Sequence, residues 1–158
     1  MADAVTVRRF EPVDCDATAR IFFDAVHVGA AGHYDAEQRR AWAPERPDGA
    51  RWLDRLTGQS TFVAERAGAV VGFMTLDPSG HIDLAFVAPE AMGQGIAFAL
   101  YRAVEAEAVR LGLDHLTTEA SLVARPFFVR QGWQVVRAQT VERRGVTLSN
   151  VRMEKRLR

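Results

Sequence analysis

The segment from Ile82 to Leu111 restricts the fold of this chain more than any other part of the sequence. Apolar side chains alternate with polar or small ones from Ile82 to Val87, and a period of two residues is typical of a half-buried strand. Pro89 ends the pattern because proline has no N–H to donate to a sheet. From Ile96 onward apolar residues recur at helical spacing, which predicts an amphipathic helix to about Leu111. The segment is therefore expected to form a strand and a helix in direct succession.

The predicted strand and helix are joined by a glycine-rich turn, Met92-Gly93-Gln94-Gly95-Ile96-Ala97. Glycines let a backbone approach a ligand closely, and the first N–H groups of a helix have no acceptor within it. The positive end of the helix dipole lies at the same place. The turn is therefore predicted to bind an anion, and phosphate is the expected one.

Two common phosphate-binding motifs do not fit this turn. A P-loop requires Lys and then Ser or Thr in fixed positions, and neither follows Gly95 there. A dinucleotide-binding fingerprint requires Gly or Ala where this chain has Phe98, and its strand opens a chain of βαβ units, whereas the Ile82 strand follows a predicted hairpin. An ordinary glycine-containing turn without a ligand stays open as an interpretation of this segment.

Three segments resemble the GNAT family of acyl-CoA N-acyltransferases. The first, VAPEAMGQGIAFAL from Val87, is similar to motif A, [QR]-x-x-G-x-[GA] after a V-x-P strand end, although Met92 stands where Gln or Arg is usual. The second, residues 121–133, resembles the pattern [NS]-x-x-A-x-x-F-Y-x-x-x-G-[FW]. The third and weaker one, residues 33–42, is similar to a segment of one GNAT subgroup. Two motifs in the correct order, with a strand between them, are more specific than either alone.

The remaining patterns complete an order of elements that agrees with this resemblance. Strands are predicted over residues 5–10, 61–65, 70–76, 115–119, 133–138 and 146–153, and helices over residues 14–28, 35–42, 47–56 and 122–131. Because a helix connects the strands at 82 and 115, these two are expected to run parallel. The resemblance implies a single domain over residues 1–158 with the GNAT fold. That fold is of the α/β (α+β) class, with helices flanking a mixed, mostly antiparallel central sheet of about seven strands.

The composition excludes several classes of function. Lys plus Arg and Asp plus Glu both number 20, so the net charge is zero and nothing directs the chain to nucleic acid or to a membrane. Cys15 is the only cysteine, which rules out an internal disulfide and a cysteine-based metal cluster, and the four histidines lack the spacing of metal ligands. No apolar run approaches a membrane span and no signal-peptide core is present, so a cytoplasmic protein is expected.

The resemblance implies transfer of an acetyl group from acetyl-CoA, as co-substrate, to the primary amine of an acceptor, without a metal or a covalent intermediate. The pyrophosphate is expected on the N–H groups of the glycine-rich turn. The pantetheine arm is expected between the strands at 82 and 115, which splay apart in such enzymes. The residues expected to bind the cofactor are Phe86, Val87, Met92, Gly93, Gln94, Gly95, Ile96, Ala97, Ser121 and Phe128.

Phe128 departs from the family pattern. Many members carry Tyr at this position, and its hydroxyl is thought to protonate the departing CoA thiolate, which Phe cannot do. A thiol with a pKa of about 8.5 is already a tolerable leaving group, so turnover can survive the change. Tyr34, Ser121 or a water molecule are the candidate substitutes.

The acceptor amine must be neutral to attack, although a free alkylamine is mostly protonated at neutral pH. A carboxylate, directly or through water, is therefore expected as the base. Asp83 on the central strand is the first candidate and Glu119 on the next strand is the second; a solvated strand-face carboxylate is the alternative interpretation of Asp83. The acceptor pocket is expected around His33, Tyr34 and Trp42, although a core position on an amphipathic helix is the favoured interpretation of Trp42.

Three functions agree with the sequence. The leading hypothesis is an acetyl-CoA-dependent N-acetyltransferase that acts on a small-molecule amine. The alternatives are a protein or peptide N-acetyltransferase and a non-catalytic acyl-CoA-binding module, a sensor or partner-binding domain, which Met92 and Phe128 favour. Residues 29–56 are expected to shape the acceptor pocket. A homodimer through the last strands would be usual for the family.

Overall fold

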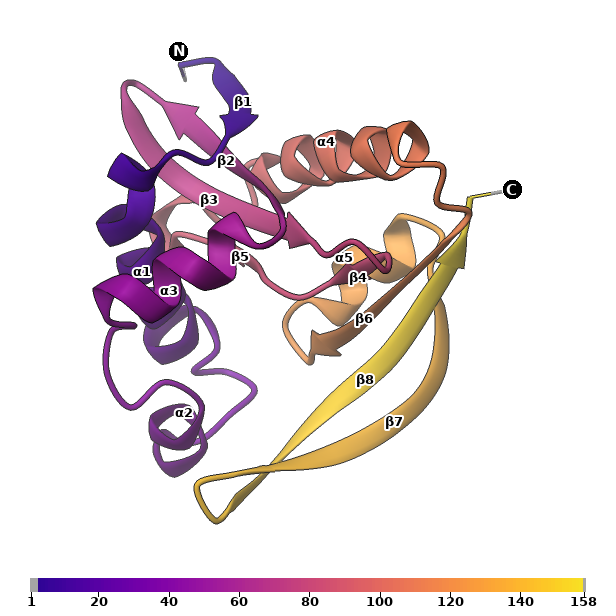
Figure 1. Cartoon of the computed structure of the whole chain (residues 1–158). Helices are drawn as coiled ribbons and strands as arrows, with labels where there is room; N and C mark the ends of the chain where they lie inside the picture. The colour runs from indigo at the N-terminus through magenta and orange to yellow at the C-terminus, as the bar shows by residue number, and fades with distance from the viewer. Residues whose placement is uncertain (1–2, 158) are drawn as a thin grey trace.

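The computed structural model describes residues 3–157, in which two four-stranded sheets lie next to each other (Figure 1). In the first sheet the strands follow the order β1-β2-β3-β5, and every neighbouring pair is antiparallel. These strands are β1 (Val5–Arg9), β2 (Ser60–Arg66), β3 (Ala69–Leu76) and β5 (Ala85–Val87).

The second sheet has the order β4-β6-β8-β7. Its strands are β4 (His81–Ile82), β6 (His115–Ser121), β8 (Val146–Arg156) and β7 (Gln134–Arg143). The β4–β6 pair is parallel, as the connecting helix predicts, and the other pairs are antiparallel. The mixed, mostly antiparallel architecture expected from the sequence is confirmed, with eight strands in place of about seven.

Helices cover both faces of the first sheet, and the second sheet is contacted by α5 at β6 and by α2 at β8 (Figure 1). The helix α4 packs against β1, β2, β3 and β5, while α1 and α3 contact the first sheet from its other side, and α5 contacts β6. The helices are α1 (Cys15–Asp24), α2 (Ala36–Trp42), α3 (Gly49–Thr57), α4 (Ile96–Arg110) and α5 (Arg125–Arg130). A π-helical turn, Ala25–Gly29, continues α1. No helix within residues 3–157 has the length and apolar content needed to cross a membrane.

The strand expected from Ile82 to Val87 is divided between the two sheets. Ile82 in β4 pairs with β6, and Ala85–Val87 form β5, which pairs with β3. Between them Leu84 is held by Thr75: its N–H donates to the Thr75 hydroxyl at 3.0 Å, and its carbonyl accepts from the Thr75 N–H at 2.9 Å. Beyond Ile82, β5 and β6 separate, which confirms the expected splay.

Two other expected boundaries differ from the structure. The helix expected over residues 122–131 begins only at Arg125, because Ser121 and Ala124 first close a turn in which the Ala124 N–H donates to both the carbonyl and the hydroxyl of Ser121. The strand expected over residues 133–138 continues to Arg143, because β8 offers it partners along its whole length.

The start of α4 lies close to the first sheet because Gly72 has no side chain. A Cβ at this position would stand 3.0 Å from Cγ2 of Ile96 and 3.2 Å from Cδ1 of Leu100. Ile96 and Leu100 are buried in the main core cluster together with Phe73. The glycine therefore fixes how deeply the first turns of α4, and the loop before them, sit on the sheet.

The other end of α4 is tied to the sheet by Glu107, whose side chain is only 3% exposed. Its carboxylate accepts hydrogen bonds from Arg110 at 2.6 Å, from Ser60 at 2.7 Å and from Arg9 at 2.9 Å. The hydrogen bond from Arg110 and those from Ser60 and Arg9 outweigh the opposing effect of burial and lower the pKa of Glu107 from 4.5 to about 2. Folding therefore favours the ionised carboxylate.

This ion pair cluster gives the protein a predictable loss of stability in acid. Because the pKa of Glu107 falls on folding, its contribution is present above pH 4.5 and is lost as the pH falls from 4.5 toward 2. The pKa difference corresponds to about 3 kcal/mol. We expect Glu107→Gln to lower the free energy of unfolding at pH 7 by about 2 kcal/mol and to flatten its decline between pH 4.5 and 2, as measured by urea unfolding.

The matched control is Glu154→Gln on β8, where the carboxylate is 38% exposed and pairs with His115. This exposed pair should contribute much less. If Glu107→Gln and the native protein lost stability equally between pH 4.5 and 2, the assignment to Glu107 would be wrong.

Candidate active site

The loop between β5 and α4 is shaped by two glycines in the left-handed region. Gly93 has φ +75° and Gly95, which caps α4, has φ +83°. A Cβ at either position would have no atom of another residue within 4 Å, so the space in front of the loop is open. Glycine is required here for its backbone conformation and leaves room for a ligand against the main chain.

The N–H groups of this loop point to an anion site. No residue within 3–157 accepts a hydrogen bond from the backbone N–H of Gly93, Gln94, Gly95, Ile96 or Ala97. Behind them lies the 15-residue helix α4, whose dipole places partial positive charge at this end. Unpaired donors and a helix dipole in one place are the arrangement that binds phosphate groups.

A cationic side chain that sequence analysis missed stands at the same loop. The Gln94 amide donates to the Glu90 carbonyl at 3.0 Å, and its oxygen accepts a hydrogen bond from the Arg66 guanidinium. Arg66 ends β2 and lies 28 residues before Gln94, so no local pattern connects the two. The guanidinium adds positive charge to the predicted anion site.

A cavity of about 400 Å³ extends from this loop into the gap between the two sheets. It is lined by nine of the ten residues expected to bind the cofactor, namely Phe86, Val87, Met92, Gly93, Gly95, Ile96, Ala97, Ser121 and Phe128. Gln94 does not line it and instead holds the loop. The Met92 side chain packs on the π-helical turn, since a Cβ on Gly29 would lie 3.2 Å from the Met92 sulfur.

A second cavity of about 430 Å³ opens from the other side of the gap. Asp83, Glu119, Tyr34 and Trp42 line it, whereas His33 is exposed and lines neither cavity. The structure thus brings both candidate bases together with two of the three residues expected in the acceptor pocket. Six residues line both cavities: Trp42, Ala85, Phe86, Ser121, Ala124 and Phe128.

The two candidate bases differ in their partners. The Asp83 carboxylate accepts two hydrogen bonds from Arg55, at 2.9 and 3.0 Å, and a third from Gln59 at 3.0 Å. Burial alone would raise the pKa of Asp83, but the hydrogen bonds and charge of Arg55 outweigh it and the pKa lies below its ordinary value. Glu119 is 40% exposed and has a single ion pair, with Arg152 at 3.6 Å.

The two hydroxyls considered as proton donors also differ. The buried Tyr34 hydroxyl donates to the Ser149 carbonyl at 2.6 Å and accepts from the Leu122 N–H at 3.0 Å, and burial raises its pKa. The Ser121 hydroxyl accepts a hydrogen bond from the Ala124 N–H at 3.1 Å, and its own proton is donated to no residue within 3–157. Of the two, only Ser121 has a proton that is free to serve a ligand.

The hairpin of β7 and β8 forms a wall of the second cavity that sequence analysis did not foresee. Val141, Arg143, Arg144, Leu148 and Asn150 line it from this hairpin. The hairpin is tied to α2, because Arg144 donates to the Ala41 carbonyl at 2.6 Å and Gln38 donates to the Thr147 carbonyl at 3.1 Å. Residues 3–157 contain no group of three or more His, Cys, Asp or Glu side chains that could hold a metal ion.

A family model for the acetyltransferase (GNAT) domain matches residues 30–157, which is most of the chain. The chain belongs to the GNAT family of N-acetyltransferases. It is 35% identical over 150 residues to the uncharacterised N-acetyltransferase YafP of Escherichia coli, with 94% of each chain covered.

Solved structures agree with this assignment. A GCN5-related N-acetyltransferase from Rhodopseudomonas palustris is 34% identical and has a TM-score of 0.93, covering 99% of this chain and 98% of that chain. The paiA N-acetyltransferase of Thermoplasma acidophilum, solved in complex with coenzyme A, is 17% identical and has a TM-score of 0.80, covering 97% of this chain and 99% of that chain. The second likeness concerns the fold alone. The GNAT resemblance stated from the sequence is confirmed, as is its implication of an N-acyltransferase.

The glycine-rich loop of this GNAT protein can be tested by a matched pair of substitutions. Gly95 and Gly112 have φ +83° and +75°, and a Cβ at either would meet open space, so Glu at either position strains the backbone alike. We expect Gly95→Glu to abolish the rise in melting temperature produced by coenzyme A, because a carboxylate would occupy the predicted pyrophosphate position. Gly112→Glu should keep that rise, which corresponds to about 2.7 kcal/mol at 100 times the dissociation constant.

ATP at the same concentration controls for general phosphate binding. An unchanged coenzyme A response in Gly95→Glu would contradict the assignment of the loop.

Proposed function

We propose that this protein transfers an acetyl group from acetyl-CoA to the primary amine of a small molecule, by direct attack of the amine on the thioester. The observation that carries the proposal is the meeting of the two cavities at Phe86, Ser121 and Phe128. One cavity begins at a phosphate-binding type of loop, and the other contains carboxylates. Two substrates that enter from opposite sides would meet at these residues, and holding two reactants in contact removes much of the entropic barrier to reaction.

The first cavity suits coenzyme A. Its pyrophosphate would accept hydrogen bonds from the N–H groups of residues 93–97, beside the Arg66 guanidinium. The strand β5 is at the edge of its sheet, so the peptide groups on its outer side are free to pair with the amides of the pantetheine arm. The paiA protein, which has a similar fold and was solved in complex with coenzyme A, supports this choice of cofactor.

Glu119 is the better base of the two carboxylates. A base that removes a proton from an ammonium group works best with a pKa close to the working pH, and Arg55 moves the pKa of Asp83 away from that range. Glu119 lies two residues before Ser121, so both side chains project from the same face of β6. We assign Glu119 as the base, acting directly or through water, and Asp83 as a residue that positions Arg55 in the wall of the cavity.

Ser121 takes the place of the missing tyrosine hydroxyl. It is the only hydroxyl-bearing residue of the six that line both cavities, and its proton is not engaged within residues 3–157. It would donate a hydrogen bond to the sulfur as the thiolate departs. Phe128 supplies an apolar surface behind the reacting atoms, where it packs edge-on against Trp133.

The size of the second cavity favours a small acceptor over a protein. Contacts between α2 and the β7–β8 hairpin close one side of it, and about 430 Å³ is a volume typical of small-molecule sites. Met92 and Phe128 are the observations in favour of a non-catalytic acyl-CoA-binding module.

Turnover separates these functions. The protein is incubated with acetyl-CoA and a panel of primary amines, and release of free coenzyme A is followed with a thiol reagent. We expect amine-dependent release above the rate of spontaneous hydrolysis. Coenzyme A binding without release for any amine would support the binding module instead, and release only with peptides would support a protein acetyltransferase.

The assignment of the base gives a second expected result. Glu119→Gln should lower kcat by about 10²- to 10⁴-fold near neutral pH, because the amine must then lose its proton unaided, and the loss should shrink as the pH approaches the pKa of the amine. Asp83→Asn should lower kcat much less and act mainly on stability, through loss of the Arg55 pair. Both variants should bind coenzyme A as the native protein does. A larger loss of kcat in Asp83→Asn than in Glu119→Gln would reverse the assignment.

A further inference from the structure

The second cavity has an uneven distribution of charge. Three arginines, Arg55, Arg143 and Arg144, line it together with Asp83 and Glu119. Arg55 and Asp83 neutralise each other through two hydrogen bonds. The remaining charged residues of the lining are Glu119 on β6, whose one ion pair is with Arg152 at 3.6 Å, and the two arginines at the turn of the β7–β8 hairpin.

Arg143 and Arg144 in the hairpin have N–H donors that form no hydrogen bond within residues 3–157. Arg144 donates one hydrogen bond to the Ala41 carbonyl, and Arg143 donates one to the carbonyl of Glu142 at 3.1 Å. Neither forms an ion pair with a carboxylate within residues 3–157. A guanidinium carries five N–H donors in a planar fork that fits a carboxylate, so this end of the cavity can bind an anion.

The part of the second cavity near Glu119 and Asn150 offers hydrogen-bond acceptors. The side-chain oxygen of Asn150 is buried and accepts no hydrogen bond within residues 3–157. Asn150 is the partner of Ser121 across the β6–β8 ladder, so its side chain projects on the same face as Ser121 and Glu119. A buried acceptor without a donor is costly, and an amine in this position would supply one beside the proposed base.

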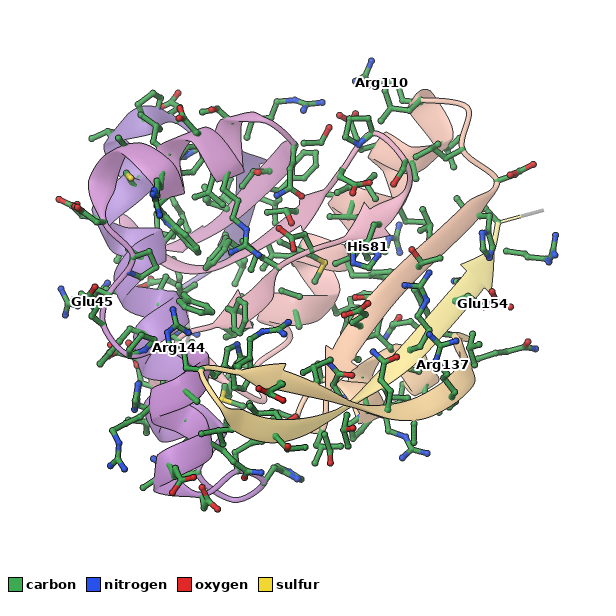
Figure 2. All side chains as sticks on the ribbon, turned by 60° about the horizontal axis from the view of Figure 1, so that its bottom comes forward. Glu45, His81, Arg110, Arg137, Arg144 and Glu154 are labelled. Carbon is green, nitrogen blue, oxygen red and sulfur yellow. The ribbon has the colours of Figure 1, made fainter. Side chains whose placement is uncertain are left out.

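We infer that the acceptor is an amine that also carries a carboxylate, with its amino group at Glu119 and Asn150 and its carboxylate at Arg143 and Arg144. The inference rests on the proposed function, because it names the substrate class of the same site. Apolar side chains of Val141, Leu148 and Trp42 lie in the same cavity and provide contact for carbon atoms of such an acceptor. Figure 2 shows Arg144 beside α2 and Arg137 far from it toward the other end of the hairpin.

The test compares amino acids with their carboxamides as acceptors. A carboxamide lowers the pKa of the neighbouring amine, so chemical reactivity alone favours the amide. For the amino acid that is acetylated best, we expect kcat/KM to be at least about tenfold higher than for its carboxamide. In Arg143→Gln this ratio should fall toward one, whereas Arg137→Gln should keep it, since Arg137 lies on β7 outside the cavity and its side chain donates, within residues 3–157, only to Gln139.

Binding to the coenzyme A complex, followed by thermal shift, gives a readout that does not require turnover. Stronger binding of the amino acid than of its amide, reduced in Arg143→Gln, supports the inference even if no amine is acetylated, and in that case only the proposed function fails. The inference is overturned if the amino acids give kcat/KM values and thermal shifts that are equal to or smaller than those of their carboxamides. Acetylation of the carboxamides would in that case still support the proposed acetyltransferase function. Unchanged discrimination in Arg143→Gln also overturns it.

Discussion

The site depends on the point at which one extended segment leaves one sheet and enters the other. β4 pairs only with β6, β5 pairs only with β3, and the two residues between them belong to neither ladder. Such a break leaves buried peptide groups without ladder partners, at a cost of about 1–3 kcal/mol each. Here the buried Thr75 supplies both a hydroxyl acceptor and an N–H donor to Leu84, and the Thr118 hydroxyl donates to the Ile82 carbonyl at 2.8 Å. Because the peptide groups of Leu84 and the carbonyl of Ile82 are satisfied, this part of the break avoids that cost where the two cavities meet in the gap.

The two sides of the gap differ in their electrostatic character. On one side the dipole of α4, five N–H groups that have no acceptor in the described part of the chain, and Arg66 favour negative charge. On the other side, acids and arginines stand at separate places on β6 and on the hairpin. Between them lie mostly apolar side chains, which lower the local polarity and make each remaining polar group, such as Ser121, count for more. Transfer of an acyl group between two polar substrates is favoured by this arrangement, in which each substrate has its own polar site and the two sites meet at an apolar centre.

Local information in the sequence located the residues of the first cavity better than those of the second. The nine predicted residues that line the first cavity all come from two continuous segments, around Gly95 and around Phe128, where glycine positions and the resemblance to GNAT motifs carry the signal. The second cavity is made by contacts between distant segments, for example Tyr34 with Ser149, 115 residues apart, and Arg144 with Ala41, 103 residues apart. No spacing rule predicts such pairs, because they depend on how the hairpin twists over α2. The division of the Ile82–Val87 segment was likewise invisible, since its alternation continues unbroken through the break.

Asp83 shows why a correct position does not by itself decide a role. Alternation along the strand placed its side chain opposite Ile82 and Leu84, and the structure agrees. Its burial would raise the pKa and make it a stronger base, but Arg55, 28 residues earlier, reverses the sign. Glu119 has the same chemistry on a neighbouring strand and keeps a longer, single ion pair. The functional difference that we propose between the two carboxylates therefore depends on one arginine of α3, whose approach is set by packing and not by the pattern of the strand on which either acid stands.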